Sequence, residues 1–402
     1  MSFKQKKYDW TLFFLFFILL IFGITSVYSV SVIKVGEELI IKGYFLKQLL
    51  WIGISLVLLT IFLFIPLSNF TDYALIYYYL SICLMIAVLF LPEINGSNRW
   101  IKIFGFQFQP SELMKFTYVL MMGKYLTKND LKESTVLFRA FLISIPVWIL
   151  LLLEPDLGST LTFVVVFFTI LIFTCININT ILLLISPILA ILFYFNIYFF
   201  LILLFLFLLF FIRNGLGWVK ITFMLIINTF FTINLSIIWN FLKPYQQTRI
   251  QTFINPLLDP LGSGYQIIQS KISIGSGGLT GKGFMESTQK NFSFLPEFHT
   301  DYIFSIISEE WGFFGNVIFL SVWFLFFYRI IYITKVNKLS SAKRIINIGL
   351  FGFIFFPFIL NIMMSLGLLP STGIPLPLTS YGGSNILITS LSIAYISIIT
   401  NE

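Results

Sequence analysis

The chain is a succession of apolar runs separated by short polar segments, and most of these runs are long enough to cross a membrane. A helix of about 20 apolar residues spans the hydrocarbon core of a bilayer. The apolar runs lie at 10–31, 46–66, 73–91, 112–127, 136–153, 158–176, 180–212, 221–241, 303–333, 345–366 and 386–400. Only 10% of the 402 residues are charged, against about 25% in an average soluble domain. The pattern predicts an all-α polytopic membrane protein, folded as a single membrane domain over residues 1–402.

Basic residues lie in short clusters between the apolar runs rather than in one patch. The clusters are Lys4, Lys6 and Lys7; Lys124, Lys128, Lys132 and Arg139; Arg213 and Lys220; and Arg329, Lys335, Lys338, Lys343 and Arg344. Such clusters mark the cytoplasmic loops of membrane proteins. The net charge of +8 therefore indicates orientation in a membrane, and we expect no nucleic acid as a partner. We expect both termini to be cytoplasmic.

The apolar run 180–212 is the one segment whose topology is ambiguous. As a single helix it would place the later basic clusters outside, whereas a hairpin turning near Asn196 keeps every basic cluster inside. We therefore predict a hydrophobic hairpin over 180–212 and twelve crossings in all. The polar segments 92–110, 242–302 and 367–385 then lie on the outer side, and 242–302 forms a large external loop.

Cysteine and histidine are scarce. Cys83 and Cys175 both lie inside apolar runs, and His299 is the only histidine. This composition excludes a disulfide framework and makes a structural zinc site implausible.

The first polar constellation lies between Asn95 and Phe116. Pro110 and Ser111 are typical of a helix start, and Glu112 and Lys115 are three residues apart, so they share one face of that helix. Such a pair inside a membrane is costly unless it lines a cavity. Two interpretations stay open: an interfacial salt bridge, or a polar pocket with Arg99 nearby as an anion ligand.

The second constellation is the pair of carboxylates Glu154 and Asp156, where a helix leaves the outer face. Paired acids can hold a divalent cation or work as acid and base. Equally, Asp156 can simply cap the following helix, with Pro155 ending the preceding one.

The third constellation is the glycine-rich run 275–283 in the external loop. It is not a P-loop, because Ser276 stands at the first glycine position and Gly283 replaces the Ser or Thr that holds magnesium. Glycine amides can still approach a phosphate closely, and Arg249 and Lys282 would add positive charge. A flexible loop is the plainer interpretation.

The fourth constellation is LPEFHTDYIF, residues 295–304, followed by Glu309 and Glu310. Asp301 stands where the external loop re-enters the membrane, and partial desolvation there favours a general base. His299 is the usual candidate at neutral pH. Residues two apart on a helix point in different directions, however, so His299 and Asp301 do not both meet one substrate atom.

These stretches together resemble one family. Their motifs occur in the order found in the SEDS (shape, elongation, division and sporulation) family. In chain order these motifs are RWI followed by QPSE and K, then PDLG, then GYQ with QSKI and GSGGL, then LPE with HTD, and finally GLLPSTGIPLPLTSYGGS. The match covers about three quarters of the chain, from Arg99 to Ser384. The segment 372–377 and the spacing around FLPE resemble the elongation (RodA) branch rather than the division (FtsW) branch.

The resemblance implies a peptidoglycan glycosyltransferase of the bacterial inner membrane, which polymerises lipid II into glycan strands on the outer face. It implies a class B penicillin-binding protein as partner and a core of ten helices, so the hairpin 180–212 is an insertion. The family's essential aspartate matches Asp301, its acid–base pair matches Glu112 and Lys115, and its loop arginine matches Arg99.

The resulting hypothesis assigns the base to Asp301 and pyrophosphate binding to Arg99, Lys115, Arg249 and Lys282, with Glu112 beside them in substrate binding. Asp156, Glu297, His299 and Glu310 are supporting residues. The leaving pyrophosphate needs basic groups or a divalent ion, so magnesium or manganese is a candidate cofactor; no metal ligands are assigned. Membrane lipids are expected partners.

Three departures from the family pattern concern polar residues. Glu154 stands where the family usually has Gln, Tyr302 where it has Phe, and Asn385 where it has Ser. None removes a proposed catalytic group.

Three other functions stay open. A flippase or transporter of lipid-linked precursors would also have buried charges, but would need them near the bilayer midplane, whereas most acids here lie at the outer edge. A division-type polymerase is the second alternative, and a scaffold that only recruits the crosslinking partner is the third.

Overall fold

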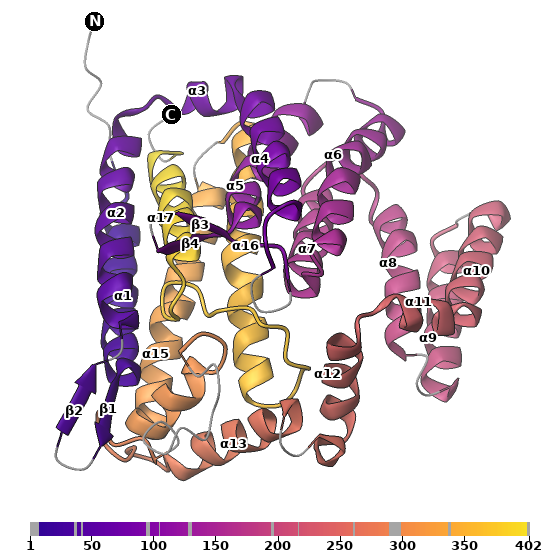
Figure 1. Cartoon of the computed structure of the whole chain (residues 1–402). Helices are drawn as coiled ribbons and strands as arrows, with labels where there is room; N and C mark the ends of the chain where they lie inside the picture. Colours follow the sequence, from indigo (N-terminus) through magenta and orange to yellow (C-terminus); the bar gives the residue numbers. More distant parts are fainter. Residues whose placement is uncertain are drawn as a thin grey trace, which may run out of the picture.

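Helices account for nearly all the regular structure of the chain (Figure 1). The computed structural model describes residues 8–35, 38–41, 43–93, 97–103, 105–127, 131–193, 197–215, 217–259, 262–288, 299–336 and 339–399. The longer helices are α1 (Trp10–Ser31), α2 (Tyr44–Phe64), α4 (Ala74–Leu89), α5 (Pro110–Leu126), α6 (Glu133–Leu153), α7 (Leu157–Ile172), α8 (Ile178–Phe193), α9 (Ile197–Arg213), α10 (Trp218–Ile233), α12 (Pro244–Ile254), α13 (Ser263–Ser276), α15 (Ile303–Val336), α16 (Ser341–Ser365) and α17 (Gly383–Ile398). The short ones are α3 (Leu67–Asp72), α11 (Leu235–Phe241) and the 3₁₀ turn η1 (Pro256–Leu258).

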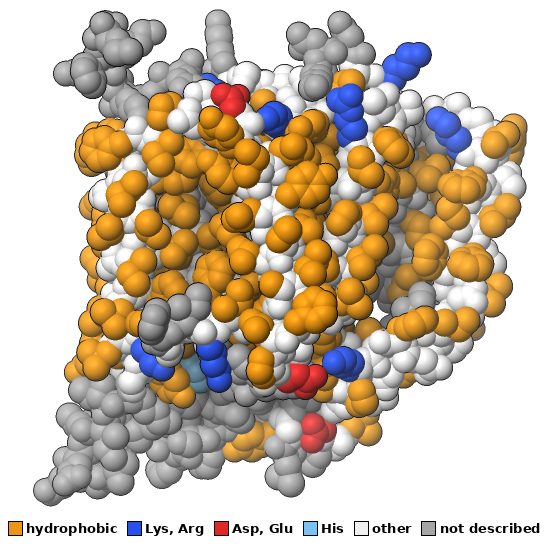
Figure 2. Space-filling view, turned by 45° about the horizontal axis from the view of Figure 1, so that its top comes forward, with side chains coloured by type: hydrophobic (Ala, Val, Ile, Leu, Met, Phe, Trp, Pro, Cys, Tyr) orange, Lys and Arg blue, Asp and Glu red, His pale blue; other side chains and the backbone are white. Residues whose placement is uncertain are grey.

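The prediction of an all-α polytopic membrane protein is confirmed. Among the described residues, five helices are long and apolar enough to cross a membrane, and α10 with α11 forms a sixth such segment bent by 47°. The helices α4, α7, α8, α9 and α17 are apolar but shorter. Figure 2 shows hydrophobic side chains over a broad belt of the molecule, with charged side chains above and below it.

Two small antiparallel hairpins were not expected from the sequence. β1 (Val32–Val35) pairs with β2 (Glu38–Ile41), and β3 (Ile101–Ile103) pairs with β4 (Phe106–Phe108). Both connect membrane helices. The strands are only three or four residues long, so alternation of apolar and polar residues in the sequence does not distinguish them from loops.

The helices α5, α16 and α17 form the centre of the bundle. α5 contacts α4 and α16, α16 also contacts α7, and α17 contacts α2, so neighbours in space are often distant in sequence. Nearly every residue of α5 and α17 is buried, whereas α2 and α4 expose apolar side chains on their outer faces. The polar residues of α5 are therefore placed among other helices, away from lipid.

The two ends of the bundle differ. At one end α1 begins and α17 ends, and we call it the termini end; at the other lie β1, β2, α12 and α13, and we call it the loop end (Figure 1). The segment 242–302 is not a plain loop, because it contains α12, η1 and α13. α13 packs against α15 and α16.

The apolar run 180–212 lies in two helices, α8 and α9, as a hairpin requires; its predicted turn near Asn196 lies outside the described residues. Together α8, α9, α10 and α11 form a unit that projects from the side of the bundle (Figure 1). This unit has a small core of its own around Phe211, Ile221 and Met224. A hydrogen bond from Asn228 Nδ2 to Ser186 Oγ (3.0 Å) joins α10 to α8.

Candidate active site

Asp301 and Arg249 both approach Gly373 at the loop end. A Cβ atom built on Gly373 would lie 3.5 Å from Nη1 of Arg249 and 3.7 Å from Oδ2 of Asp301. The φ angle of Gly373 is +72°, a conformation that favours glycine. The missing side chain thus leaves a gap that a carboxylate and a guanidinium both face.

Asp301 is held through its backbone rather than through its position on a helix. The side chain of Asn361, on α16, donates to the carbonyl oxygens of Asp301 (2.8 Å) and Ile374 (2.9 Å). Ser380 Oγ donates to the carbonyl of Thr300. The segment 299–301 is therefore tied to the segment 374–381, and Asp301 is placed just before α15 begins.

Arg249 lies on α12 and is oriented by several contacts. Its Nη1 lies 3.5 Å from the carbonyl oxygen of Ser371, and its guanidinium stacks 5.7 Å from the centre of the Tyr245 ring. Tyr245 OH in turn donates to the carbonyl of Pro155 (2.8 Å). These contacts anchor α12 beside the start of α7, so Arg249 needs no large movement to face Asp301.

The pKa of Tyr302 depends on the charges of both Asp301 and Arg249. Its hydroxyl is buried, and burial is the main reason that its pKa is raised; the negative charge of Asp301 raises it further, while Arg249 lowers it. One phenol therefore senses both charged groups, which supports their placement around one gap.

A second charged cluster surrounds Asp156. Asp156 caps α7 through the backbone N–H of Ser159 (3.1 Å) and accepts from Gln109 Nε2 (3.0 Å). Arg99 Nη1 lies 3.6 Å from Asp156 Oδ1. The capping interpretation of Asp156 is confirmed, and Arg99 pairs with Asp156 instead of joining Glu112 and Lys115.

Glu154 lies beside this cluster and is fully buried, with 0% of its surface exposed. Neither carboxylate oxygen has a hydrogen-bond partner among the described residues. Burial, followed by the nearby charge of Asp156, raises the pKa of Glu154 to about 8, although Arg99 opposes the shift. Glu154 is therefore mostly neutral at pH 7.

The two clusters are neighbours because α7 packs tightly on the segment that follows α16. A Cβ on Gly158 would lie 2.9 Å from the carbonyl oxygen of Thr372, closer than any side chain tolerates without movement. Gly158 therefore lets the start of α7 approach Gly373, and with it Arg99 and Asp156 approach the gap between Arg249 and Asp301.

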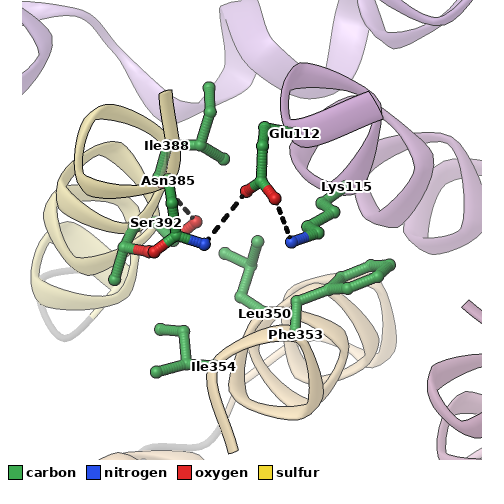
Figure 3. A pocket seen from close by; sticks show the side chains of 9 residues that line it. Glu112, Lys115, Leu350, Phe353, Ile354, Asn385, Ile388 and Ser392 are labelled. Carbon is green, nitrogen blue, oxygen red and sulfur yellow. Dashed lines mark hydrogen bonds and ion pairs between the residues drawn. The ribbon is translucent and has the colours of Figure 1, made fainter. Parts of the chain in front are cut away.

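Glu112 and Lys115 form a separate, buried ion pair inside the bundle (Figure 3). Lys115 Nζ donates to Glu112 Oε1 (2.6 Å), and Asn385 Nδ2 donates to Glu112 Oε2 (3.2 Å). The side chains line a cavity of about 10 Å³ with Leu350, Phe353 and Ser392, which is room for about one water molecule. The predicted pocket exists, but it is small and its charges are already paired.

The glycine-rich run packs its backbone against α15. The N–H groups of Lys282 and Gly283 donate to the carbonyls of Glu309 (2.9 Å) and Glu310 (3.1 Å). α15 is broken at Gly312, whose φ is +62°, and a Cβ there would lie 2.2 Å from the nitrogen of Gly281. Gly277, Gly281 and Gly312 are needed because two backbones touch at this point.

Glu309 and Glu310 are buried beneath this turn. Glu309 accepts from Lys282 Nζ (2.6 Å), Ser273 Oγ (3.1 Å) and Thr288 Oγ1 (2.7 Å), and Ser29 donates to Glu310. Lys282 thus stabilises the turn, and its predicted contact with substrate stays a prediction.

His299 lies two residues before Asp301 and packs against aromatic rings. Its ring stacks on Tyr44 with centroids 4.3 Å apart, and its carbonyl accepts from the N–H of Tyr381 (3.0 Å). This placement fits the supporting role predicted for it. Glu297, the other predicted supporting residue, lies outside the described residues.

No group of three or more His, Cys, Asp or Glu side chains suited to a metal ion occurs within the described part of the chain. The predicted magnesium or manganese ion therefore has no assigned ligands and stays a prediction.

Two residues of this site, Asn361 and Gly373, were not predicted from the sequence. Asn361 is a lone amide within the apolar run 345–366, and a polar residue in a membrane helix signals a functional or structural partner. Gly373 lies in the segment 372–377 that resembles the family, but the sequence does not indicate which side chains approach it in space.

The chain matches one family model over nearly its whole length. The FTSW_RODA_SPOVE model, described as "Cell cycle protein", matches residues 9–203 and 196–402. The curated relatives include the peptidoglycan glycosyltransferase RodA of Treponema pallidum, 31% identical over 95% of this chain and 94% of its own length. They also include the peptidoglycan glycosyltransferase MrdB of Escherichia coli K12, 32% identical over 94% of this chain and 90% of its own length.

Solved structures share the fold. A chain from a study titled "Structural coordination of polymerization and crosslinking by a peptidoglycan synthase complex" superimposes with a TM-score of 0.72 and 26% identity, covering 98% of this chain and 97% of its own. The crystal structure of the rod shape determining protein RodA of Thermus thermophilus gives a TM-score of 0.63 at 23% identity, covering 98% and 96%. With these matches and the ordered motifs, the chain belongs to the FtsW, RodA and SpoVE family of cell cycle proteins.

Proposed function

We propose that the chain polymerises lipid II into glycan strands at the loop end of the bundle. It is a peptidoglycan glycosyltransferase, as its curated relatives RodA and MrdB are named. The observation that carries the proposal is the gap at Gly373, where the carboxylate of Asp301 and the guanidinium of Arg249 face the same space.

In the proposed reaction, Asp301 accepts the proton of a sugar hydroxyl on the acceptor. A carboxylate positioned in this way contributes about 10²- to 10⁴-fold to the rate. The hydroxyl oxygen forms a bond to the anomeric carbon of the donor. The bond from that carbon to the diphosphate oxygen breaks, and the electron pair leaves with undecaprenyl diphosphate.

Arg249 is the strongest candidate for binding the leaving diphosphate. Arginine binds phosphate oxygens through paired N–H groups, and Arg249 lies within reach of the gap that Asp301 faces. Arg99 is a second candidate, partly neutralised by Asp156. Lys115 is a weaker one, because Glu112 already holds its ammonium group inside the bundle.

We also propose a cellular process, a membrane and a protein partner for the chain. The relatives comprise both RodA and FtsW proteins at similar identity, and the motifs resemble the elongation branch, so we assign the chain to cell elongation. We place it in the bacterial inner membrane with cytoplasmic termini, paired with a class B penicillin-binding protein. A divalent ion bound with the diphosphate would add positive charge beside Arg249.

The test is lipid II polymerisation by the purified full-length Asp301→Asn variant, with and without the penicillin-binding partner. We expect glycan synthesis to fall by at least about 10²-fold, with an unchanged melting temperature. Glu286→Gln is the matched control, because Glu286 is an exposed acid on the same segment; it should polymerise normally. Near-normal synthesis by a folded Asp301→Asn variant would refute the assignment.

A further inference from the structure

A second pocket lies at the opposite end of the bundle from Asp301. It has a volume of about 410 Å³ and is lined by Lys132, Glu133, Ser134, Leu137, Thr180 and Lys220. These residues come from the start of α6, the start of α8 and the start of α10. The pocket therefore lies where the projecting unit α8–α11 meets the central bundle.

The charge balance of this pocket is positive. Lys132 and Lys220 are both exposed, and neither makes an ion pair or hydrogen bond through its ammonium group within the described ranges. The carboxylate of Glu133 is occupied, since Thr180 Oγ1 (2.5 Å) and the backbone N–H of Asn177 (3.3 Å) both donate to it. Two lysines and one carboxylate that is already hydrogen bonded thus line the pocket, and this balance favours an anionic ligand.

The helix starts add to this potential. α6 begins at Glu133, α8 at Ile178 and α10 at Trp218, so three helices present their N-terminal ends to one pocket. The N-terminal end of a helix carries a partial positive charge. This charge supplements the two lysines, which are the primary ligands.

The flanks of the pocket are apolar and face outward. Trp218, two residues from Lys220, is 73% exposed, and Phe138, next to Leu137, is 68% exposed. Exposed tryptophan is typical of the level where lipid head groups meet the hydrocarbon. A ligand at this position can therefore place an anionic group between the lysines and an acyl chain along α6.

We propose that this pocket binds the phosphate head group of an anionic phospholipid. Basic pockets between membrane helices are typical sites for such head groups. The lipid would bridge Lys132 on the central bundle and Lys220 on the projecting unit, and so fix the unit α8–α11 against α6. This inference goes beyond the proposed polymerase activity and does not depend on it.

The experiment compares lipids of different head group on the full-length protein. Purified protein in detergent is exposed to phosphatidylglycerol or phosphatidylcholine, and the bound lipid is counted by native mass spectrometry. We expect retention of phosphatidylglycerol but not of phosphatidylcholine. The double variant Lys132→Gln with Lys220→Gln should retain phosphatidylglycerol roughly thirtyfold more weakly, since each lysine near an anionic lipid contributes about fivefold.

The matched control is Lys335→Gln with Lys343→Gln, which removes the same charge from a basic cluster outside the pocket. The charge-conserving Lys132→Arg with Lys220→Arg variant should retain binding, which separates lost charge from lost fold. Equal loss in the pocket and control variants would overturn the proposal, as would equal retention of both lipids. Competition by inorganic phosphate as strong as that by the lipid would also overturn it, because the site would then bind phosphate alone.

Discussion

Two charged clusters of this protein contain the same kinds of group but differ in what they leave open. The Glu112–Lys115 pair is buried, with 5% and 6% exposed surface, and its groups bind one another and Asn385. Asp301 and Arg249 are half-buried and border a gap left by a glycine. One cluster is closed by its own hydrogen bonds, and the other borders the position where Gly373 has no side chain.

The difference teaches that charge within a membrane protein does not by itself identify a catalytic group. A buried pair must be satisfied internally, because an unpaired charge there costs several kcal/mol. A catalytic group must keep part of its bonding capacity for the substrate. Variants in the two clusters should therefore fail in different ways.

The largest expected effect is on stability, in the closed cluster. Lys115→Met leaves the Glu112 carboxylate buried without its cation, and we expect a loss of about 3–5 kcal/mol in the free energy of unfolding. Thermal unfolding in detergent measures it. The double variant Glu112→Leu with Lys115→Met should recover most of the loss, because both charges are gone. If the Lys115→Met protein has normal stability but cannot polymerise lipid II, Lys115 contacts the substrate. The distinction between a structural and a catalytic cluster would then be wrong.

In the open cluster, the expected effect is on activity. Arg249→Ala should lower kcat/KM for lipid II polymerisation by about 10²-fold, since it removes a charged donor from the leaving group, and should leave the melting temperature nearly unchanged. Arg249→Lys should be intermediate, because lysine keeps the charge but not the paired geometry. Unfolding of the alanine variant without any effect on the activity of the folded fraction would show that Arg249 is only structural.

Glu154, beside Asp156, provides a test through pH. Its ordinary pKa of 4.5 is raised to about 8 in the folded protein, so the folded state keeps a proton that the unfolded chain releases. Stability should fall as pH rises from about 4.5 to 8. Glu154→Gln removes this slope and should be more stable than the parent by on the order of 4 kcal/mol at pH 8, with little difference at pH 4.5. Parallel melting curves for parent and variant across this range would show that Glu154 is ionised in the folded protein.

The smallest expected effect concerns Asn385. Asn385→Ser removes the hydrogen bond to Glu112, and we expect a loss of about 1 kcal/mol in the free energy of unfolding. Polymerisation by the folded protein should change little, because the pair itself remains. A loss of activity larger than the loss of stability would indicate that the closed cluster also positions substrate.

Several features were predictable because they depend on neighbours along the chain. The helix over 10–31 coincides with α1 (Trp10–Ser31), and the capping role of Asp156 follows from a carboxylate placed directly before a helix. The i, i+3 pairing of Glu112 with Lys115 also follows from local helix geometry. The break at Gly312 within the predicted helix 303–333 was not predicted, because the glycine-rich turn that requires it lies about thirty residues earlier in the sequence.

The sequence by itself determined that the chain is a helical membrane protein, which of its segments are polar, and that Asp301 stands where a polar segment re-enters the membrane. Hydrophobic length and local capping depend only on residue order, so they can be read directly. Only the tertiary structure decided that Arg249 joins Asp301 at Gly373, that Arg99 pairs with Asp156, and that Lys282 is occupied by Glu309. Those pairings depend on how helices distant in the sequence pack together, and neither composition nor residue spacing determines that packing.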